Sequence, residues 1–243
     1  FFFHPPPPNP DPLWSRGLGD VYKRQVVVYF KPKELVSGDF YWAHKDKDIS
    51  YIALADCTGH GVPGALMSMI GFNGLNQAVL DLGMREPSDI LNSLNEFVLE
   101  SLKHGETTRV KDGMDISLCK INSKDLRLTY SCSLMKVYII RNGKLIILRS
   151  NRFAIGNINN HLPFTQEVVP LEKGDQVYLF SDGYVDQFGG KLGKKFKYKN
   201  FRKLILNISK PGVNKEKTLN KILSNWMGSE EQIDDISLIS FKV

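Results

Sequence analysis

Four aspartates, each beside a hydrophobic segment of the kind that forms strands, are the residues of this chain with the clearest potential for chemistry. They are Asp39, Asp56, Asp182 and Asp234, in the segments SGDFYW, ADCTGHG, FSDG and IDDIS. Carboxylates at strand ends can meet at one edge of a folded sheet, where like charges repel one another unless a cation neutralises them. Carboxylate, carbonyl and water oxygens are typical ligands of Mg²⁺, Mn²⁺ or Ca²⁺. The sequence therefore predicts a hard-metal site.

Alternatives exist for these residues and for their neighbours. A single Asp is common in turns, where its side chain hydrogen-bonds nearby backbone groups, but four together favour a shared site. Cys57 directly follows Asp56, so a reactive thiol is an alternative, although nothing in the sequence predicts a lowered thiol pKa. His60 has two candidate roles, as a general acid or as a group that orients a metal ligand. Both roles remain open at this point.

The composition bounds the domain count and the class of partner. With 243 residues and a hydrophobic content of 42%, the chain can bury a substantial core, and we expect a single domain. An excess of 32 Lys and Arg over 26 Asp and Glu gives a formal charge of +6, which favours an anionic partner. Nucleic acid is not expected as a partner, because no nucleic-acid-binding motif accompanies this charge.

Cysteine spacing and hydropathy indicate the location. Cys57, Cys119 and Cys132 show no CxxC spacing, which favours a reducing cytoplasm over a disulfide scaffold. No apolar run approaches the roughly 18 to 20 residues of a membrane span, so we expect no membrane segment in this chain.

Residues 1–25 differ from the rest of the chain. They begin with three Phe residues and continue with a run of prolines, a composition that cannot form a regular core element. The stretch from Trp14 to Gln25 resembles translated sequencing-adapter read-through. We therefore expect residues 1–25 to be non-native or disordered, and the functional domain to span residues 26–243.

From residue 26 onward the patterns are those of a packed domain with strands and helices. Apolar and β-branched runs predict strands over 26–30, 39–44, 49–55, 115–121, 126–132, 136–141, 144–148, 176–180 and 235–243. Helical spacing predicts helices over 63–80, after Pro87, over 201–208 and over 215–226. Asn142-Gly143 is a strong signal for a two-residue hairpin turn. This order predicts paired antiparallel sheets covered by helices.

Five motifs follow one another in a specific order along the chain. They are KPKELVSGDFYW, ADCTGHGVPGALMSMIG, DGMDISLC, GDQVYLFSDGYVDQFGG and DDISLI, and they span about residues 31–243. Together they resemble the stage II sporulation protein E type of metal-dependent protein phosphatase, a bacterial branch of the type 2C superfamily. The resemblance implies an α+β fold, an α/β/β/α sandwich of two mainly antiparallel sheets flanked by helices, with a two-metal centre at one end of the sheets.

The resemblance also implies roles for residues of the first two motifs. Asp39 corresponds to a metal-site acid, and Asp56 to the acid that bridges both metals. Cys57 would contribute its backbone carbonyl oxygen to a metal, which leaves its thiol without a role. His60 lies inside the same motif and is a candidate catalytic residue. The implied cofactor is a pair of Mn²⁺ or Mg²⁺ ions.

The remaining acids come from the last two motifs. Asp182 and Asp234 correspond to acids on the first metal, and Asp182 joins Asp56 among the expected catalytic residues. Asp235 is a second candidate ligand beside Asp234. Because adjacent residues of a strand point to opposite faces, only one of this pair can aim directly at the metals.

Two features bear on substrate contacts. Related sequences commonly have a Gly- and Asn-containing turn before an apolar strand, whereas residues 130–138, YSCSLMKVY, contain neither residue. A basic stretch after Asp186 is either a solvated surface or a guide for an acidic phosphoprotein. Its members are Lys191, Lys194, Lys195, Lys197, Lys199, Arg202 and Lys203.

The implied function is hydrolysis of phosphoserine or phosphothreonine on a signalling protein by direct attack of a water that bridges the two metals. An anti-anti-sigma-factor-like phosphoprotein is the kind of partner that the resemblance suggests, and a missing upstream sensory domain is an expectation of the same kind. The alternative is a catalytically weak regulatory module of the same fold that binds phosphoproteins. Retention of the four acids favours the enzyme.

Overall fold

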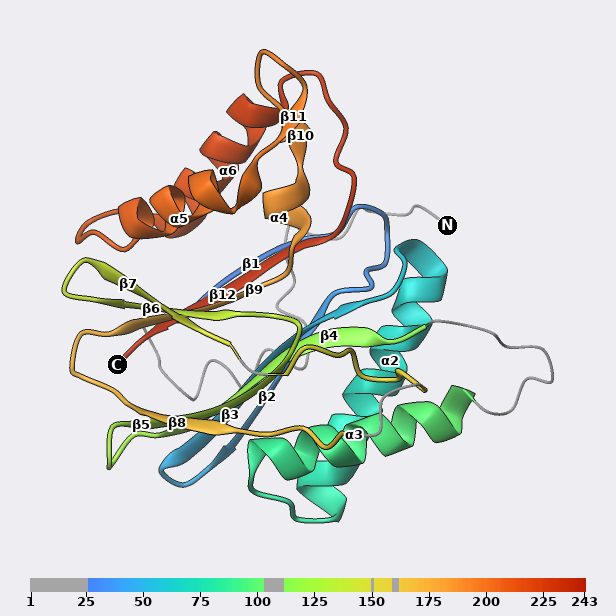
Figure 1. The fold of residues 1–243 in the computed structure, drawn as a ribbon. Helices are drawn as coiled ribbons and strands as arrows, with labels where there is room; N and C mark the ends of the chain where they lie inside the picture. Colours follow the sequence, from blue (N-terminus) through green and yellow to red (C-terminus); the bar gives the residue numbers. More distant parts are fainter. Residues whose placement is uncertain (1–25, 103–111, 150, 159–161) are drawn as a thin grey trace, which may run out of the picture.

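Two five-stranded antiparallel sheets pack face to face in the computed structural model, and a pair of helices covers the outer face of each sheet (Figure 1). The expected α/β/β/α sandwich and α+β class are confirmed. The structure describes residues 26–102, 112–149, 151–158 and 162–243. Residues 1–25, for which we expect a non-native or disordered segment, lie outside the described residues. Within the described ranges, every helix falls short of the length and apolarity that crossing a bilayer requires.

The first sheet has the C-terminal strand near its centre. Its order is β1-β12-β9-β6-β7, and all neighbouring strands are antiparallel. The strands are β1 (Val26–Lys31), β12 (Ile236–Lys242), β9 (Gln176–Phe180), β6 (Val137–Arg141) and β7 (Lys144–Leu148). The predicted hairpin turn joins β6 to β7, where Asn142 and Gly143 have φ values of 50° and 73°.

The second sheet has the order β2-β3-β4-β5-β8 and is also antiparallel throughout. Its strands are β2 (Phe40–Asp46), β3 (Ile49–Cys57), β4 (Met114–Asn122), β5 (Arg127–Ser133) and β8 (Glu167–Pro170). The first four strands were predicted to within a few residues. The fifth, β8, was missed, because it has only four residues and three of them are exposed at the sheet edge.

The helices form the two outer layers. Helices α2 (Gly61–Asn76) and α3 (Pro87–Leu102) cover the second sheet, and α5 (Lys197–Ile208) and α6 (Lys215–Met227) cover the first. The remaining elements are the π-helical turn η2 (Gln77–Asp81), the single-turn helix α4 (Gly183–Asp186) and the strands β10 (Phe188–Gly189) and β11 (Lys194–Lys195). The helix predicted over 63–80 is thus α2 followed by η2, and α5 begins four residues earlier than predicted.

Side-chain alternation explains why the strands read as nearly continuous apolar runs. On β3, Ile52 and Leu54 belong to the hydrophobic cluster between the two sheets. Tyr51, Ala53 and Ala55, on the opposite face of β3, pack in the cluster under α2 and α3. A strand that is buried on both faces leaves its ends as the places where charged side chains can reach water.

The segment that departs from the family pattern forms the short connection from β5 to β6. Leu134 has a φ of 54°, in the left-handed region, and its side chain is 48% exposed. This conformation costs an ordinary L-residue roughly 1–2 kcal/mol, and Asn tolerates it better than Leu. The turn is therefore formed without the Gly or Asn that suits its left-handed position best, and it places Lys136 just before β6.

Candidate metal centre

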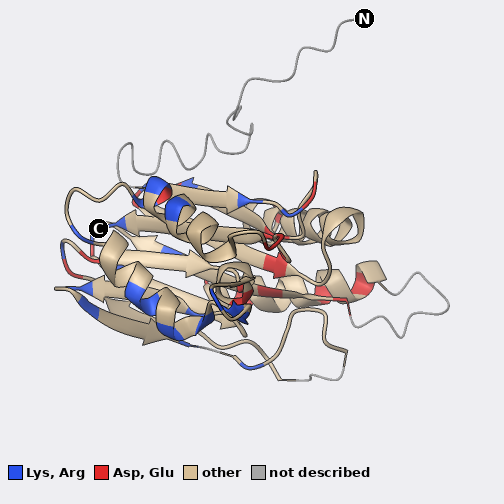
Figure 2. Ribbon diagram, turned by 90° about the horizontal axis from the view of Figure 1, so that it is seen from above, with Lys and Arg blue, Asp and Glu red and all other residues tan. Residues whose placement is uncertain are grey.

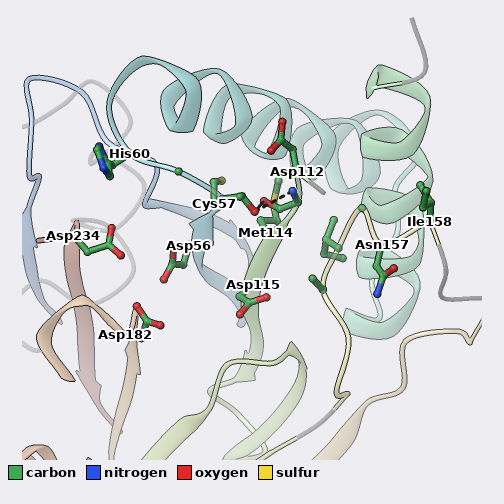
Figure 3. Close-up of a pocket in the computed structure, with 16 residues that line it drawn as sticks. Asp56, Cys57, His60, Asp112, Met114, Asp115, Asn157, Ile158, Asp182 and Asp234 are labelled. Atoms are coloured by element: carbon green, nitrogen blue, oxygen red, sulfur yellow. Dashed lines mark hydrogen bonds between the residues drawn. The ribbon is translucent and has the colours of Figure 1, made fainter. Parts of the chain in front are cut away.

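Five aspartates, from the two sheets and the loops beside them, line one open pocket (Figure 3). The pocket has a volume of about 780 Å³, and its lining includes Asp56, Asp115, Asp182 and Asp234. Asp56 and Asp115 belong to β3 and β4, whereas Asp182 follows β9 and Asp234 precedes β12. In the ribbon of Figure 2, most Asp and Glu positions (red) lie along the middle and right of the view, whereas Lys and Arg positions (blue) are most numerous toward the left. The structure thus brings together three of the predicted acids and adds Asp115 and Asp112.

Backbone pairing holds these acids in place. Asp56 and Asp115 are direct partners in the register of β3 and β4. Side chains of directly opposed residues are neighbours, and two like charges in such a pair are destabilising. In the other sheet, the backbone N–H of Ser181 donates a 3.0 Å hydrogen bond to the carbonyl oxygen of Ser237, which fixes the end of β9 beside the start of β12.

Burial and mutual repulsion raise the pKa values of the pocket acids. The pKa of Asp56 is raised to about 9, first by burial and then by the carboxylates of Asp39 and Asp182. Burial, followed by the charge of Asp182, raises the pKa of Asp115 to about 7. The pKa values of Asp182 and Asp234 are raised as well, with burial as the largest cause. Without a cation, the site is an unfavourable concentration of negative charge.

The donor chemistry of the pocket fits a hard divalent cation. Carboxylate oxygens suit Mg²⁺ and Mn²⁺, and a bound cation would favour the ionised forms that repulsion disfavours here. In the part of the chain that the structure describes, no three Asp, Glu, His or Cys side chains are close enough to enclose an ion. The fit therefore rests on charge and donor type, and the assignment of individual ligands stays a prediction.

Asp39 lies outside the lining of the pocket. Its side chain is buried, and one oxygen accepts a 2.5 Å hydrogen bond from the Ser237 hydroxyl. Burial raises the pKa of Asp39 to about 7, although hydrogen bonds from Ser181 and Ser237 oppose this shift. Because Asp39 in turn raises the pKa of Asp56, it lies within electrostatic range of the site. Its predicted role as a metal ligand is not tested by this arrangement.

Asp235 supports the backbone, and Asp234 faces the pocket. The two carboxylate oxygens of Asp235 accept hydrogen bonds of 2.7 Å from the backbone N–H groups of Lys33 and Gly38. The side chain is 3% exposed and does not line the pocket. Asp235 therefore ties the segment before β2 to the start of β12. Of the two adjacent acids, Asp234 is the candidate ligand.

Cys57 is buried, and burial raises the pKa of its thiol, with the charge of Asp56 as the next cause. A protonated, buried thiol is a poor nucleophile, so the alternative of a reactive Cys57 is not supported. Its backbone carbonyl oxygen would lie 3.3 Å from a Cβ placed on Gly38. The loop before β2 therefore passes close to the end of β3, and the predicted role of this carbonyl stays a prediction.

His60 lies at the rim of the pocket, where both ring nitrogens have partners. Nδ1 is 2.6 Å from a carboxylate oxygen of Glu34, and Nε2 is 2.9 Å from the Nζ of Lys33. An imidazole that donates from Nδ1 and accepts at Nε2 satisfies both contacts. Glu34 and Lys33 therefore orient the ring, whereas the two candidate roles of His60 both stay open.

Sequence reasoning missed Asp115 as a site residue. The motif DGMDISLC contains it, and the strand predicted over 115–121 begins at this acid. An acid at the end of an apolar strand was the signal that identified the other aspartates, and it applies here too. What the sequence lacked was the register that places Asp115 opposite Asp56. Asp112, three residues earlier, also lines the pocket.

We expect Gly183→Ala to weaken metal binding and stability together. A Cβ on Gly183 would lie 2.0 Å from the backbone oxygen of Asp235. The backbone beside Asp182 and the backbone beside Asp234 must therefore move apart. Such overpacking costs about 1–3 kcal/mol in the free energy of unfolding. Displaced ligands should lower Mn²⁺ affinity by about tenfold or more. Thermal unfolding and calorimetric titration with Mn²⁺ measure the two effects.

Gly143→Ala is the matched control for this substitution. Gly143 has a positive φ of 73°, and a Cβ there meets nothing within 4 Å. The control should cost about 1 kcal/mol through strain in the hairpin turn and leave Mn²⁺ affinity unchanged. Unchanged Mn²⁺ affinity in Gly183→Ala would contradict the role given to this close approach.

Comparisons with known proteins point to one family. Residues 46–243 match the family described as stage II sporulation protein E (SpoIIE). Phosphoserine phosphatase RsbU of Bacillus subtilis (strain 168) is 30% identical over 161 residues, which cover 64% of this chain and 44% of that relative. The chain thus spans less than half the length of RsbU.

Solved structures share the fold. The SiaA-PP2C domain of Pseudomonas aeruginosa matches with a TM-score of 0.82 and 28% identity, over 94% of this chain and 88% of that domain. RsbX in complex with magnesium matches with a TM-score of 0.62 and 17% identity, over 90% of this chain and 94% of RsbX. The second likeness concerns the fold alone.

Proposed function

Because the chain belongs to the stage II sporulation protein E (SpoIIE) family, we propose that it is a protein phosphatase domain that hydrolyses phosphoserine or phosphothreonine with two divalent cations, Mn²⁺ or Mg²⁺. The observation that carries this proposal is the meeting of Asp56, Asp115, Asp182 and Asp234 around one open pocket. The similar RsbU is named a phosphoserine phosphatase, and RsbX binds magnesium on the same fold, which supports both parts of the proposal.

The residues of the chain have different tasks in this proposal. Asp56, near the end of β3, would serve both ions in this proposal, and Asp182 and Asp234 would hold one of them. Asp39 and the Cys57 carbonyl are the candidates for the other ion. When bound, the two cations would supply an activated water and neutralise charge on the phosphoryl oxygens. His60 at the rim is the candidate for handling the proton of the leaving group.

The substrate that fits this site is a phosphorylated protein. The pocket is open to solvent on one side and is lined by acids, so a phosphate group enters it only when cations offset the charge of the aspartates. We propose a signalling phosphoprotein of the anti-anti-sigma-factor-like kind as the partner, in accord with the family. A cytoplasmic location and a sensory domain upstream stay predictions.

Phosphate release measured with and without metal tests the function. Purified protein should release phosphate from a phosphoserine and a phosphothreonine peptide in Mn²⁺ or Mg²⁺, lose this activity in EDTA, and regain it when the metal is restored. Turnover that persists undiminished in EDTA would refute the metal-dependent mechanism. Peptide binding without Mn²⁺ binding or turnover would instead favour the catalytically weak regulatory module, an alternative that the family and the crowded carboxylates do not favour.

A further inference from the structure

Three positively charged side chains lie close together beside the candidate metal centre, where the first sheet packs against α5. Lys136 stands just before β6 and Arg149 just after β7, next to the paired residues Val137 and Leu148 of the two strands. Lys136 and Arg149 are therefore neighbours across the open end of the hairpin. Arg202 approaches from α5, with its Nε 3.5 Å from the hydroxyl of Tyr138. We call these three residues the cation cluster.

Tyr198 connects the cation cluster to the acidic pocket. The Nζ of Lys136 lies 3.9 Å from the centroid of the Tyr198 ring, in the first turn of α5. Burial raises the pKa of Tyr198 to about 12, and the charges of Asp182, Asp186 and Asp115 add to the shift. The tyrosine is thus close to both groups. Val137 of β6 pairs with Leu179 of β9, so Lys136 lies beside the end of β9 that leads to Asp182. The cation cluster therefore lies on the Asp182 side of the pocket.

Among the residues that the structure describes, the three cations lack an anionic partner. No ion pair among the described residues includes any of them. The pKa of Lys136 is lowered, first by burial and then by the positive charges of Arg149 and Arg202. By contrast, Lys195 of the basic stretch is paired with Asp186 at 2.6 Å. Lys136 and Arg202 are half-buried and Arg149 is exposed. Neighbouring cations that repel one another form a favourable site for an anion from outside.

We propose that Lys136, Arg149 and Arg202 form an anion-binding subsite that holds a negatively charged side chain of the phosphoprotein, next to the residue whose phosphate enters the pocket. This inference rests on the proposed function. The anion is an Asp or Glu carboxylate or a second phosphoryl group, since both present the oxygens that Arg and Lys bind. Of the basic stretch after Asp186, only Arg202 belongs to the subsite.

Peptides with and without a flanking anion test the subsite. A phosphoserine peptide is compared with versions that carry Asp, Glu or a second phosphoserine at each of the neighbouring positions, and with Asn and Gln versions as neutral controls. The wild-type protein should prefer at least one anionic version by about tenfold in kcat/KM, mainly through KM. The carboxylate and phosphoserine arms decide which anion is preferred.

Three variants assign the preference to the cation cluster. Lys136→Met and Arg202→Gln remove a charge but keep much of the side-chain bulk, and each should reduce the preference to about twofold or less, with turnover of p-nitrophenyl phosphate unchanged. Lys144→Met, an equal charge change at the exposed far end of β7, should keep the wild-type preference.

The outcomes separate failure of the inference from failure of the proposed function. A wild-type protein that turns over p-nitrophenyl phosphate but shows no preference for an anionic flank overturns the subsite. An equal loss of this preference in Lys136→Met and Lys144→Met would also overturn the subsite, because it would indicate general attraction by net charge. A wild-type protein that turns over none of these substrates with Mn²⁺ refutes the phosphatase proposal itself.

Discussion

Asp56→Asn should reduce phosphate release by at least about a thousandfold in saturating Mn²⁺, since the position proposed to bridge two ions would lose one negative charge and one strong ligand oxygen. Burial first, and then the neighbouring carboxylates, raise the pKa of Asp56 to about 9, so its ionised form depends on a nearby cation. Initial rates with a phosphoserine peptide, together with calorimetric titration of Mn²⁺, measure the loss and show whether it follows metal binding.

The control for this substitution lies at the other end of the same strand. Asp48 directly precedes β3 and is exposed, so Asp48→Asn makes the same chemical change away from the pocket and should leave the rate within about twofold of wild type. A rate for Asp56→Asn above about a tenth of wild type would contradict the bridging role.

The same substitution should make the metal-free protein more stable. In EDTA at pH 8, we expect the Tm of Asp56→Asn to exceed that of wild type by at least about 3 °C, which corresponds to about 1 kcal/mol for a domain of this size. The reason is that, at pH 8, the metal-free protein must either take up a proton at Asp56 when it folds or bury a carboxylate that Asp39, Asp182, Asp234 and Asp115 repel, whereas a neutral amide avoids both costs. Differential scanning calorimetry of both proteins in chelator measures the change.

The stabilisation of the metal-free protein by Asp56→Asn should depend on pH. An acid whose pKa is raised in the folded state binds its proton more tightly there than in the unfolded chain. Metal-free wild type should therefore lose stability as pH rises from the ordinary Asp56 pKa of 3.8 to its folded value of about 9. Asp56→Asn should lose less over this range, and the Tm difference should shrink toward pH 4. A wild type as stable as the variant at pH 8 would rule out the charge explanation.

Local sequence patterns predicted most of the fold. Strands that are apolar on both faces and an Asn-Gly turn are signals carried by neighbouring residues, so β3 and the β6 to β7 hairpin were correct. The edge strand β8 has four mostly exposed residues and carries no such signal. Strand ends were predictable for the same reason, and with them the positions of Asp56, Asp182 and Asp234.

Long-range pairing explains what the sequence could not predict about the site. That Asp115 opposes Asp56 depends on the register between β3 and β4, which no local pattern specifies. The separate roles of Asp234 and Asp235 depend on contacts with Lys33 and Gly38, about two hundred positions away in the sequence. The cation cluster likewise requires a hairpin and a distant helix to be packed together.

The position of β12 has a consequence for the order in which the protein becomes active during synthesis. β12 is the last described strand in the chain, yet it lies between β1 and β9, and Asp234 lies two residues before it. A ribosome-bound chain that lacks this segment also lacks Asp234 and the Asp235 carboxylate that holds the loop before β2. The proposed site is therefore complete only after β12 has been translated and inserted between β1 and β9, and we expect a chain that ends before Asp234 to release no phosphate.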